Sequence, residues 1–369
     1  MSLTKNQTIR LWPLMVATLL IPLNFVVLIV RHDNSTVQLA LFEMFAGLQF
    51  VLAIFGIVRV MRWHEVYGRL LTGVLSAFGA LLVLIALGAA ALGALASVIG
   101  GAAWGRPLRV RGRQIHVRLA IGEGWAAGQQ PQVTDLDPAS AKALEALWLH
   151  DAQKEHASVP AFARLTWLLI AAGAPSELVA WSQRACSEEI DHARRCFALA
   201  SGYGGTTHTV MPMPELLGSA MDGVRSAPLT LAVESVKDGC LLEDYNADIA
   251  SACAKVCEDS ATKEVLERIA REERSHAAFS WAVLRWCLCE HTMEVLEAVR
   301  EAQGEMSRMA RPTAVTNALA PLVAAADPAT LRRHGRLPDS QWAEMWERRR
   351  ILTHERLADL LVNNVALAG

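Results

Sequence analysis

Three long apolar runs fill the first third of the chain. They cover residues 9–30, 37–61 and 70–95, and small apolar residues continue the third run to position 103. Because about 20 consecutive apolar residues span the hydrocarbon core of a bilayer, we expect each run to form a transmembrane helix. Residues 1–104 are therefore predicted to be a membrane region of three spans.

The pattern changes after the third run. Residues 108–121 alternate between apolar and polar positions around Arg111-Gly112-Arg113, which predicts a short hairpin inside a linker over 105–138. From residue 139 onward, apolar positions recur at helical spacing. Four long helices are predicted, over 139–172, 176–201, 228–258 and 262–290.

The connections between these helices indicate their topology. The first two and the last two are joined tightly, whereas a segment rich in Gly, Pro and Met over 202–227 separates the pairs. Short, long, short is the connectivity of a four-helix bundle with one crossover. The predicted fold class is all-α: three N-terminal transmembrane helices, a four-helix bundle over 139–290, and a C-terminal helical extension over 291–369 with a clear helix at 341–366.

Charge divides the chain in nearly the same place. Residues 1–120 hold 11 Lys or Arg and 3 Asp or Glu, whereas residues 121–369 hold 24 and 34. An acidic globular part without a basic stripe argues against a nucleic-acid partner. The seven cysteines lie between positions 186 and 289 and form no CxxC pair, so we interpret them as reduced thiols in a reducing compartment.

The second and fourth predicted helices each carry a Glu-x-x-His motif. Glu189 shares a helical face with His192, and Glu273 shares one with His276. The first and third helices each offer one lone glutamate, 34 and 30 residues before the motif glutamate of the same hairpin. The predicted metal ligands are Glu155, Glu189, His192, Glu243, Glu273 and His276.

A surface ion pair is the simpler interpretation of these charges, since Glu189 could pair with Arg194 or Arg195. However, the neighbours of the four glutamates on their helical faces are apolar, and a buried carboxylate is costly without a strong partner. Four carboxylates and two imidazoles that converge in a bundle core are typical of a di-iron or di-manganese site.

Four further polar residues are predicted to support the ligands from outside. Ser158 and Asn246 stand three residues after the two lone glutamates, and Asp191 lies within the first motif. His156 follows Glu155 but lies about 100° further around the helix, so we expect it to be a supporting residue rather than a ligand.

These motifs resemble the ferritin-like superfamily, which includes rubrerythrins, bacterioferritins and di-iron oxygenases. Glu155-His156-Ala157-Ser158-Val159 and Glu189-Ile190-Asp191-His192-Ala193-Arg194 are most similar to an uncharacterised group of bacterial ferritin-like domain proteins. The resemblance covers about 105–290 and implies two iron ions, or a Mn/Fe pair, at the six ligands. Pro160 stands where alanine is expected, and its missing N–H should kink the first helix.

The chemistry of the predicted dimetal site favours an oxidoreductase that activates dioxygen and oxidises an organic substrate, with electrons from a separate donor. The predicted spans favour a lipid-like substrate and a lipid bilayer as partner. They indicate a multi-pass protein of a bacterial inner membrane with a cytoplasmic ferritin-like domain. The oligomeric state is left open, with a homodimer as one alternative. The alternative is a membrane-bound ferroxidase, peroxidase or other iron-handling protein. A rubrerythrin-like peroxidase is weakened because the sequence lacks paired CxxC motifs.

Overall fold

Most of what the structure describes belongs to the C-terminal part of the chain. In the computed structural model, the described residues are 51–55, 57–58, 105–110, 113–217, 224, 226–290 and 293–367. The chain divides into two compact units, Met1–Ile99 and Gly100–Gly369, which we treat separately. In the first unit, the described residues are helical.

The prediction of three transmembrane helices is wrong for the part of the chain that the structure describes. No helix there is both long enough and apolar enough to cross a membrane. The long helices of the second unit carry charged residues along their outer faces, so none offers about 20 consecutive apolar positions. The predicted spans over 9–30, 37–61 and 70–95 otherwise lie outside the described residues. The predicted inner-membrane localisation and bilayer partner depended on those spans and are therefore unsupported.

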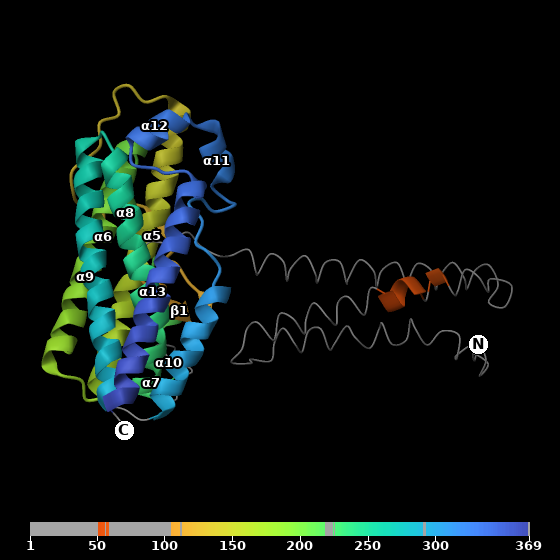
Figure 1. The fold of residues 1–369 in the computed structure, drawn as a ribbon. Helices are drawn as coiled ribbons and strands as arrows, with labels where there is room; N and C mark the ends of the chain where they lie inside the picture. Colours follow the sequence, from red (N-terminus) through yellow and green to blue (C-terminus); the bar gives the residue numbers. More distant parts are fainter. Residues whose placement is uncertain are drawn as a thin grey trace, which may run out of the picture. The chain divides into compact units, whose positions relative to one another are not determined.

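Two helical hairpins form the centre of the second unit (Figure 1). Helix α5 packs along α6, while α8 and the π-helical segment η2 pack along α9. The hairpins meet through contacts between α6 and α9 and between α5 and α7. The bounds are α5 Pro138–Ala171, α6 Ser176–Gly204, α7 Ala227–Glu234, η2 Ser235–Glu243, α8 Asp244–Val256 and α9 Ser260–Glu290.

Local sequence signals set the ends of the first hairpin. Asp137 caps α5 by accepting a hydrogen bond from the backbone N–H of Ser140, and Pro138 takes the first helical position, where a missing N–H costs little. Gly173, with a φ of 71°, reverses the chain after α5. Helix α5 runs through Pro160 without a break, so this proline does not end the helix that carries Glu155.

The third predicted helix is not uniform. It begins as α7, continues as the nine-residue π-helix η2, and returns to α-helix in α8. A π-helix bonds each N–H five residues back instead of four, and such segments occur frequently at functional sites. The last residue of η2 is Glu243, so the irregular segment delivers one of the predicted ligands.

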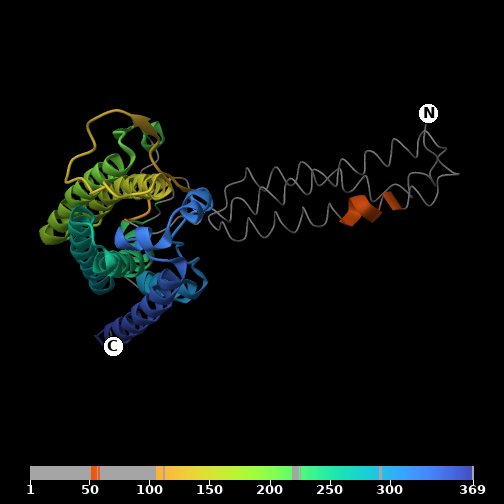
Figure 2. The same ribbon diagram turned by 90° about the horizontal axis from the view of Figure 1, so that it is seen from above.

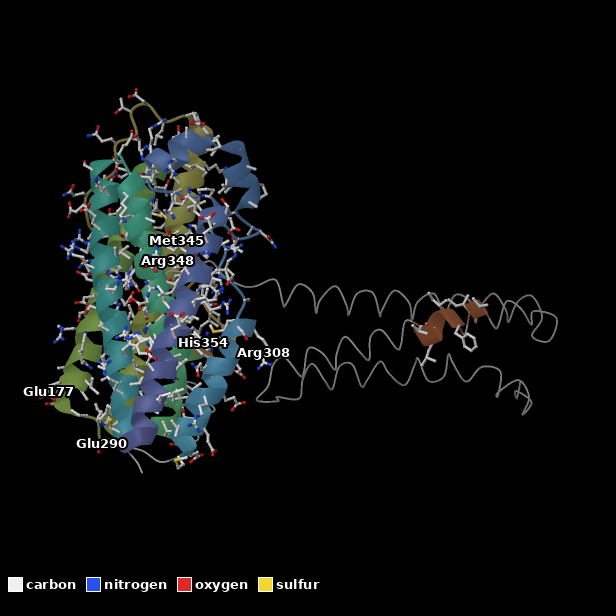
Figure 3. All side chains as sticks on the ribbon, viewed as in Figure 1. Glu177, Glu290, Arg308, Met345, Arg348 and His354 are labelled. Carbon is white, nitrogen blue, oxygen red and sulfur yellow. The ribbon has the colours of Figure 1, made fainter. Side chains whose placement is uncertain are left out.

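The C-terminal helices pack on both hairpins. Helix α13 packs on α8, η2 and α9, and α11 and α12 pack on α5 (Figure 2). Large aromatic side chains fill the core, among them Trp148, Trp281 and Trp346. Charged side chains such as Glu177 and Arg348 point outward (Figure 3). The bounds are α10 Met293–Glu305, η3 Met306–Arg308, α11 Ala320–Ala325, α12 Pro328–Arg333 and α13 Asp339–Leu367.

Short strands tie the linker to the bundle. β1 (Arg109–Val110) pairs antiparallel with β2 (Arg113–Gln114), at the place of the predicted hairpin. β3 (Leu119–Ile121) pairs antiparallel with β4 (His208–Val210), which belongs to the long crossover after α6. This second pairing joins segments that are about 90 residues apart, and the sequence analysis did not predict it. A short 3-10 turn, η1 (Pro214–Leu216), follows β4.

Candidate metal centre

The two Glu-x-x-His motifs face each other across the interface between α6 and α9. Glu189 and His192 lie one turn apart on α6, and Glu273 and His276 lie one turn apart on α9. All four side chains are fully buried. The i, i+3 spacing puts the carboxylate and imidazole of each motif on one helical face, which is the face turned toward the opposite hairpin.

The two lone glutamates complete the cluster from the other two helices. Glu155 comes from the middle of α5 and Glu243 from the end of η2, and both are fully buried. The structure therefore brings together all six residues that the sequence singled out. Four different helical segments supply them, so the cluster exists only when both hairpins are packed.

The six side chains form two overlapping donor sets. Within each set, one ligand atom per residue can be chosen so that all chosen atoms lie within 4.8 Å of one another. Glu189 and Glu273 belong to both sets, as expected of carboxylates that bridge two cations. The first set adds Glu155 and His192 to these two residues, and the second adds Glu243 and His276.

The imidazole Nδ1 atoms point into this cluster. His192 Nδ1 lies 3.6 Å from oxygens of both Glu155 and Glu189, and His276 Nδ1 lies 3.2 Å from Glu189 Oε1. The centroids of the two imidazole rings are 6.1 Å apart. Both rings thus present one nitrogen to the same group of carboxylates.

The donor atoms of the cluster lack partners. All eight oxygens of the four glutamates, and the Nδ1 atoms of both histidines, are buried without a hydrogen-bond partner among the described residues. Buried carboxylates in that condition are strongly unfavourable. A cation held by these atoms would satisfy them, and carboxylate oxygen with imidazole nitrogen is a donor set that suits iron, manganese and zinc. The buried Glu and His groups could therefore hold a metal ion.

Burial raises the pKa of three of the four cluster carboxylates. Burial, followed by the nearby charge of Glu189, raises the pKa of Glu155 to about 8. Burial and the charge of Glu243 raise the pKa of Glu273 well above its usual value, and burial also raises the pKa of Glu243. Burial acts in the same direction on Glu189, but the two histidines outweigh it and lower its pKa.

The histidine pKa values move in the opposite sense to simple burial. Burial alone would lower the pKa of His276, but Glu188 and Glu189 outweigh it and raise the pKa to about 9. For His192, the same balance against Glu155, Glu189 and Glu272 also raises the pKa. Acids and imidazoles that hold protons at neutral pH must release them when a cation binds, because the ligating forms are deprotonated.

Two glutamates outside the cluster hold the imidazoles in a crosswise arrangement. Glu188 on α6 accepts a hydrogen bond from Nε2 of His276 on α9 at 2.8 Å, and Glu272 on α9 accepts one from Nε2 of His192 on α6 at 2.7 Å. Such bonds fix the ring orientation and the tautomer, and leave Nδ1 free for a metal. The sequence analysis missed both residues. The available signal was that an acid directly precedes each motif glutamate.

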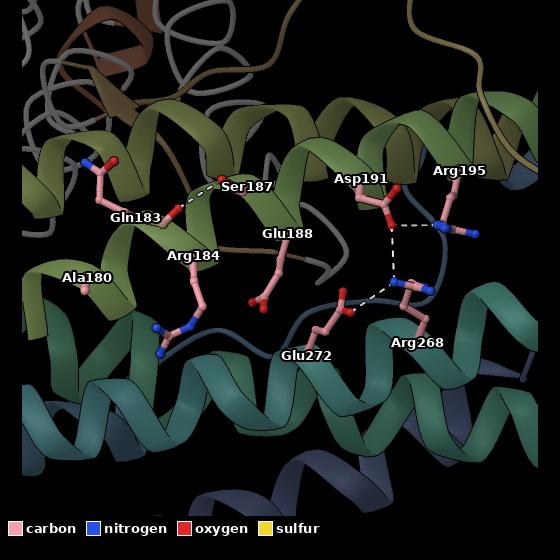
Figure 4. A pocket seen from close by; sticks show the side chains of 9 residues that line it. All are labelled: Ala180, Gln183, Arg184, Ser187, Glu188, Asp191, Arg195, Arg268 and Glu272. Atoms are coloured by element: carbon pink, nitrogen blue, oxygen red, sulfur yellow. Dashed lines mark hydrogen bonds and ion pairs between the residues drawn. The ribbon is translucent and has the colours of Figure 1, made fainter. Parts of the chain in front are cut away.

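A surface cleft of about 680 Å³ lies over these two glutamates (Figure 4). Glu188 and Glu272 line it, and side chains from the outer faces of α6 and α9 surround them. Asp191 lies at one end and pairs with Arg195 at 2.6 Å and with Arg268 at 3.6 Å. The cleft is thus one hydrogen bond away from each cluster histidine.

The other predicted supporting residues do not bond to the ligands in the described structure. His156 packs its ring against Trp125 at 4.6 Å, and burial lowers its pKa to about 4. Ser158 donates to the backbone carbonyl of Arg106, and the amide of Asn246 faces the backbone of Gly105. Asp191 pairs with arginines instead of a histidine. Ser158 and Asn246 therefore anchor the linker segment that crosses the site.

No known protein family, curated protein or solved structure matches the chain. The class that the fold and site define is therefore a helical protein with a buried Glu/His cluster that could bind metal. The resemblance to ferritin-like proteins stays a proposal that rests on the residues themselves.

Proposed function

We propose that the chain is a ferritin-like dimetal oxidoreductase that uses two iron ions, or a Mn/Fe pair, to activate dioxygen and oxidise an organic substrate. The observation that carries the proposal is the pair of donor sets that share Glu189 and Glu273. One cation held by either set would leave one glutamate and one histidine of the six residues without a cation partner. Two divalent cations would balance the charge of four carboxylates and give each of the six residues a cation partner.

Each group of residues has a distinct task in this proposal. Glu189 and Glu273, which belong to both donor sets, would contribute to both metal positions, and Glu155 and Glu243 would each contribute to one of them. Glu188 and Glu272 hold the histidine rings so that Nδ1 points inward. Phe162 shields the site on the side of His276, with ring centroids 5.1 Å apart. A ferrous pair, when bound, supplies the electrons that reduce dioxygen.

The test is anaerobic loading with ferrous iron, followed by exposure to dioxygen. We expect two metal ions per chain, oxygen uptake on exposure, and oxidation of an added organic substrate that depends on a reductant. Glu189→Ala should reduce metal content below one per chain, because it removes a donor common to both sets. The control Glu264→Ala changes an exposed glutamate on α9 and should leave the stoichiometry at two.

Each part of the proposal can fail separately. A stoichiometry of one or zero would refute the dimetal centre. Two ions per chain with dioxygen converted only to water or ferric mineral would replace the oxidoreductase with the iron-handling alternative. Efficient turnover of hydrogen peroxide without substrate oxidation would favour a peroxidase.

A further inference from the structure

A buried arginine beside the cluster has no hydrogen-bond partner for its terminal nitrogens among the described residues. Arg106 is 3% exposed, and both of its terminal nitrogens, Nη1 and Nη2, are without a hydrogen-bond partner among the described residues. An arginine keeps its charge at any ordinary pH and is almost never buried unpaired. The position of Arg106 is fixed, since its backbone carbonyl accepts a hydrogen bond from Ser158 at 3.1 Å.

The guanidinium lies next to the metal centre. Its central carbon is 5.5 Å from the ring centroid of Phe162, and that ring is 5.1 Å from the ring of His276. The guanidinium carbon is therefore no more than 10.6 Å from a predicted ligand. Its charge also lowers the pKa of Glu243, although burial acts more strongly in the other direction.

Two acids close to Gly239 in the chain each bind another arginine, although Oδ1 of Asp238 has no hydrogen-bond partner among the described residues. Asp238 binds Arg109, and Glu234 makes two hydrogen bonds to Arg164. If two divalent cations neutralise the four glutamates of the cluster, Glu243 no longer offers Arg106 a net negative charge. The charge of Arg106 then calls for an anion from outside the described part of the chain.

The surroundings of Arg106 offer a second donor. At Gly239, in η2, a Cβ would lie 3.5 Å from Arg106 Nη1 and would overlap the hydroxyl of Ser280. That hydroxyl is itself buried without a partner. The glycine therefore lets the π-helix pass close to two donors that have no partner among the described residues, Arg106 Nη1 and Ser280 Oγ.

We propose that Arg106 binds the carboxylate of the substrate, with Ser280 as a second donor, so that the substrate class is a short carboxylic acid held beside the metal centre. This inference takes the position of the metal centre from the proposed function, but its test does not depend on oxidoreductase activity. The two parallel N–H groups of a guanidinium match two oxygens of a carboxylate or of a phosphate. A carboxylate carries a single charge, which the single charge of Arg106 balances, whereas a phosphate at neutral pH carries more negative charge and costs more to bury. The distance to His276 limits the acid to a small one.

The test measures binding to the full chain loaded with redox-inert zinc. Acetate and benzoate are the probes, acetamide and benzamide are the uncharged controls, and inorganic phosphate tests the alternative anion. We expect both carboxylates to raise the melting temperature of the wild type and to give saturable heats in calorimetry, with the amides at least tenfold weaker. Phosphate should bind more weakly than benzoate.

The variants are Arg106→Gln and Arg106→Met, with Arg118→Gln as the control, which changes an exposed arginine on the same linker. Both Arg106 variants should weaken benzoate binding at least tenfold, and Arg118→Gln should keep the wild-type affinity. Arg106→Met should also melt above the wild type when no carboxylate is present, because it removes a buried unpaired charge.

Several results would overturn the inference. These are equal benzoate affinity in Arg106→Gln and wild type, equal affinity for benzoate and benzamide, or tighter binding of phosphate than of benzoate. Equal affinity of the wild type for benzoate and benzamide refutes the inference even if the variants do not fold. A preference for the acid supports it together with the loss in the Arg106 variants, because bound zinc also takes carboxylate ligands. Two metals per chain without carboxylate binding refute this inference alone, whereas carboxylate binding without oxygen-dependent turnover refutes only the proposed function.

Discussion

Removal of Glu188 should weaken one metal position and spare the other. Glu188 holds His276, which belongs only to the donor set with Glu243, whereas the matching residue Glu272 holds His192 in the other set. Loss of an outer hydrogen bond to a ligating histidine typically costs 10–100-fold in metal affinity. That corresponds to about 1.4–2.7 kcal/mol of binding free energy for a single ion.

Titration with cobalt(II), followed by its visible absorption and by calorimetry, resolves the two positions. For the wild type we expect two ions per chain. Glu188→Ala should keep one tightly bound ion and weaken the affinity for the second ion by 10–100-fold. For Glu188→Gln, the affinity for the second ion should lie between those of the wild type and Glu188→Ala, because an amide oxygen still accepts a hydrogen bond. Glu272→Ala should show the same pattern, and the double variant should weaken both ions.

Exposed Glu264 on α9 provides the control, since its side chain is 47% exposed and pairs with Arg195. Glu264→Ala should leave both affinities within twofold of the wild type. The reasoning is refuted if Glu188→Ala weakens both ions equally, or if neither affinity changes. The first result would mean one shared site, and the second would mean that the crosswise bonds do not orient the histidines.

Three more predictions follow from the structure. Metal affinity should rise with pH up to about 8–9, with proton release visible to an indicator dye, because the raised pKa values of Glu155 and His276 keep protons on the free ligands; affinity independent of pH between 6 and 8 would contradict this. Gly239→Ala should cost about 1–3 kcal/mol in a denaturant titration, since its Cβ would overlap Ser280, whereas Gly304→Ala in α10 meets no atom within 4 Å and should be neutral or stabilising. Burial, with Lys154 nearby, lowers the pKa of His116 to about 4 and that of His150 to about 2, so the unfolded chain binds more protons than the folded chain below pH 6.5. The free energy of unfolding should therefore decrease as the pH is lowered below 6.5, by up to about 1.4 kcal/mol per pH unit for each histidine. If the double variant to Gln keeps the same slope of unfolding free energy against pH, the histidines are not its origin.

The positions of the long helices and of the cluster residues could be predicted because both depend on short spacings. Helix α9, for example, begins two residues before its predicted start and ends at the predicted residue. Glu273 and His276 share a helical face wherever the helix begins and ends, since three residues are nearly one turn. Such local geometry is contained in the sequence. That the cluster binds metal stays a prediction.

Other features depend on packing that spacing does not encode. The π-helix η2 changes the register by one residue, yet its apolar positions fit a continuous α-helix, so Glu243 was assigned to the wrong kind of helix. The pairing of β3 with β4 depends on where a long crossover returns. The lack of hydrogen-bond partners at the terminal nitrogens of Arg106 among the described residues can be recognised only when all its neighbours are known. The three transmembrane helices were predicted from the length and apolar character of three runs, and this prediction was wrong for the described residues.

The crosswise bonds between α6 and α9 make metal uptake a reporter of tertiary assembly. Each hairpin contains a complete Glu-x-x-His sequence, yet the carboxylate that orients its imidazole is contributed by the opposite hairpin. Neither half can prepare a coordination sphere alone, although both halves carry the motif. In the proposed function, cation capture would therefore be a late event in maturation, which follows the docking of the two halves and then holds them together.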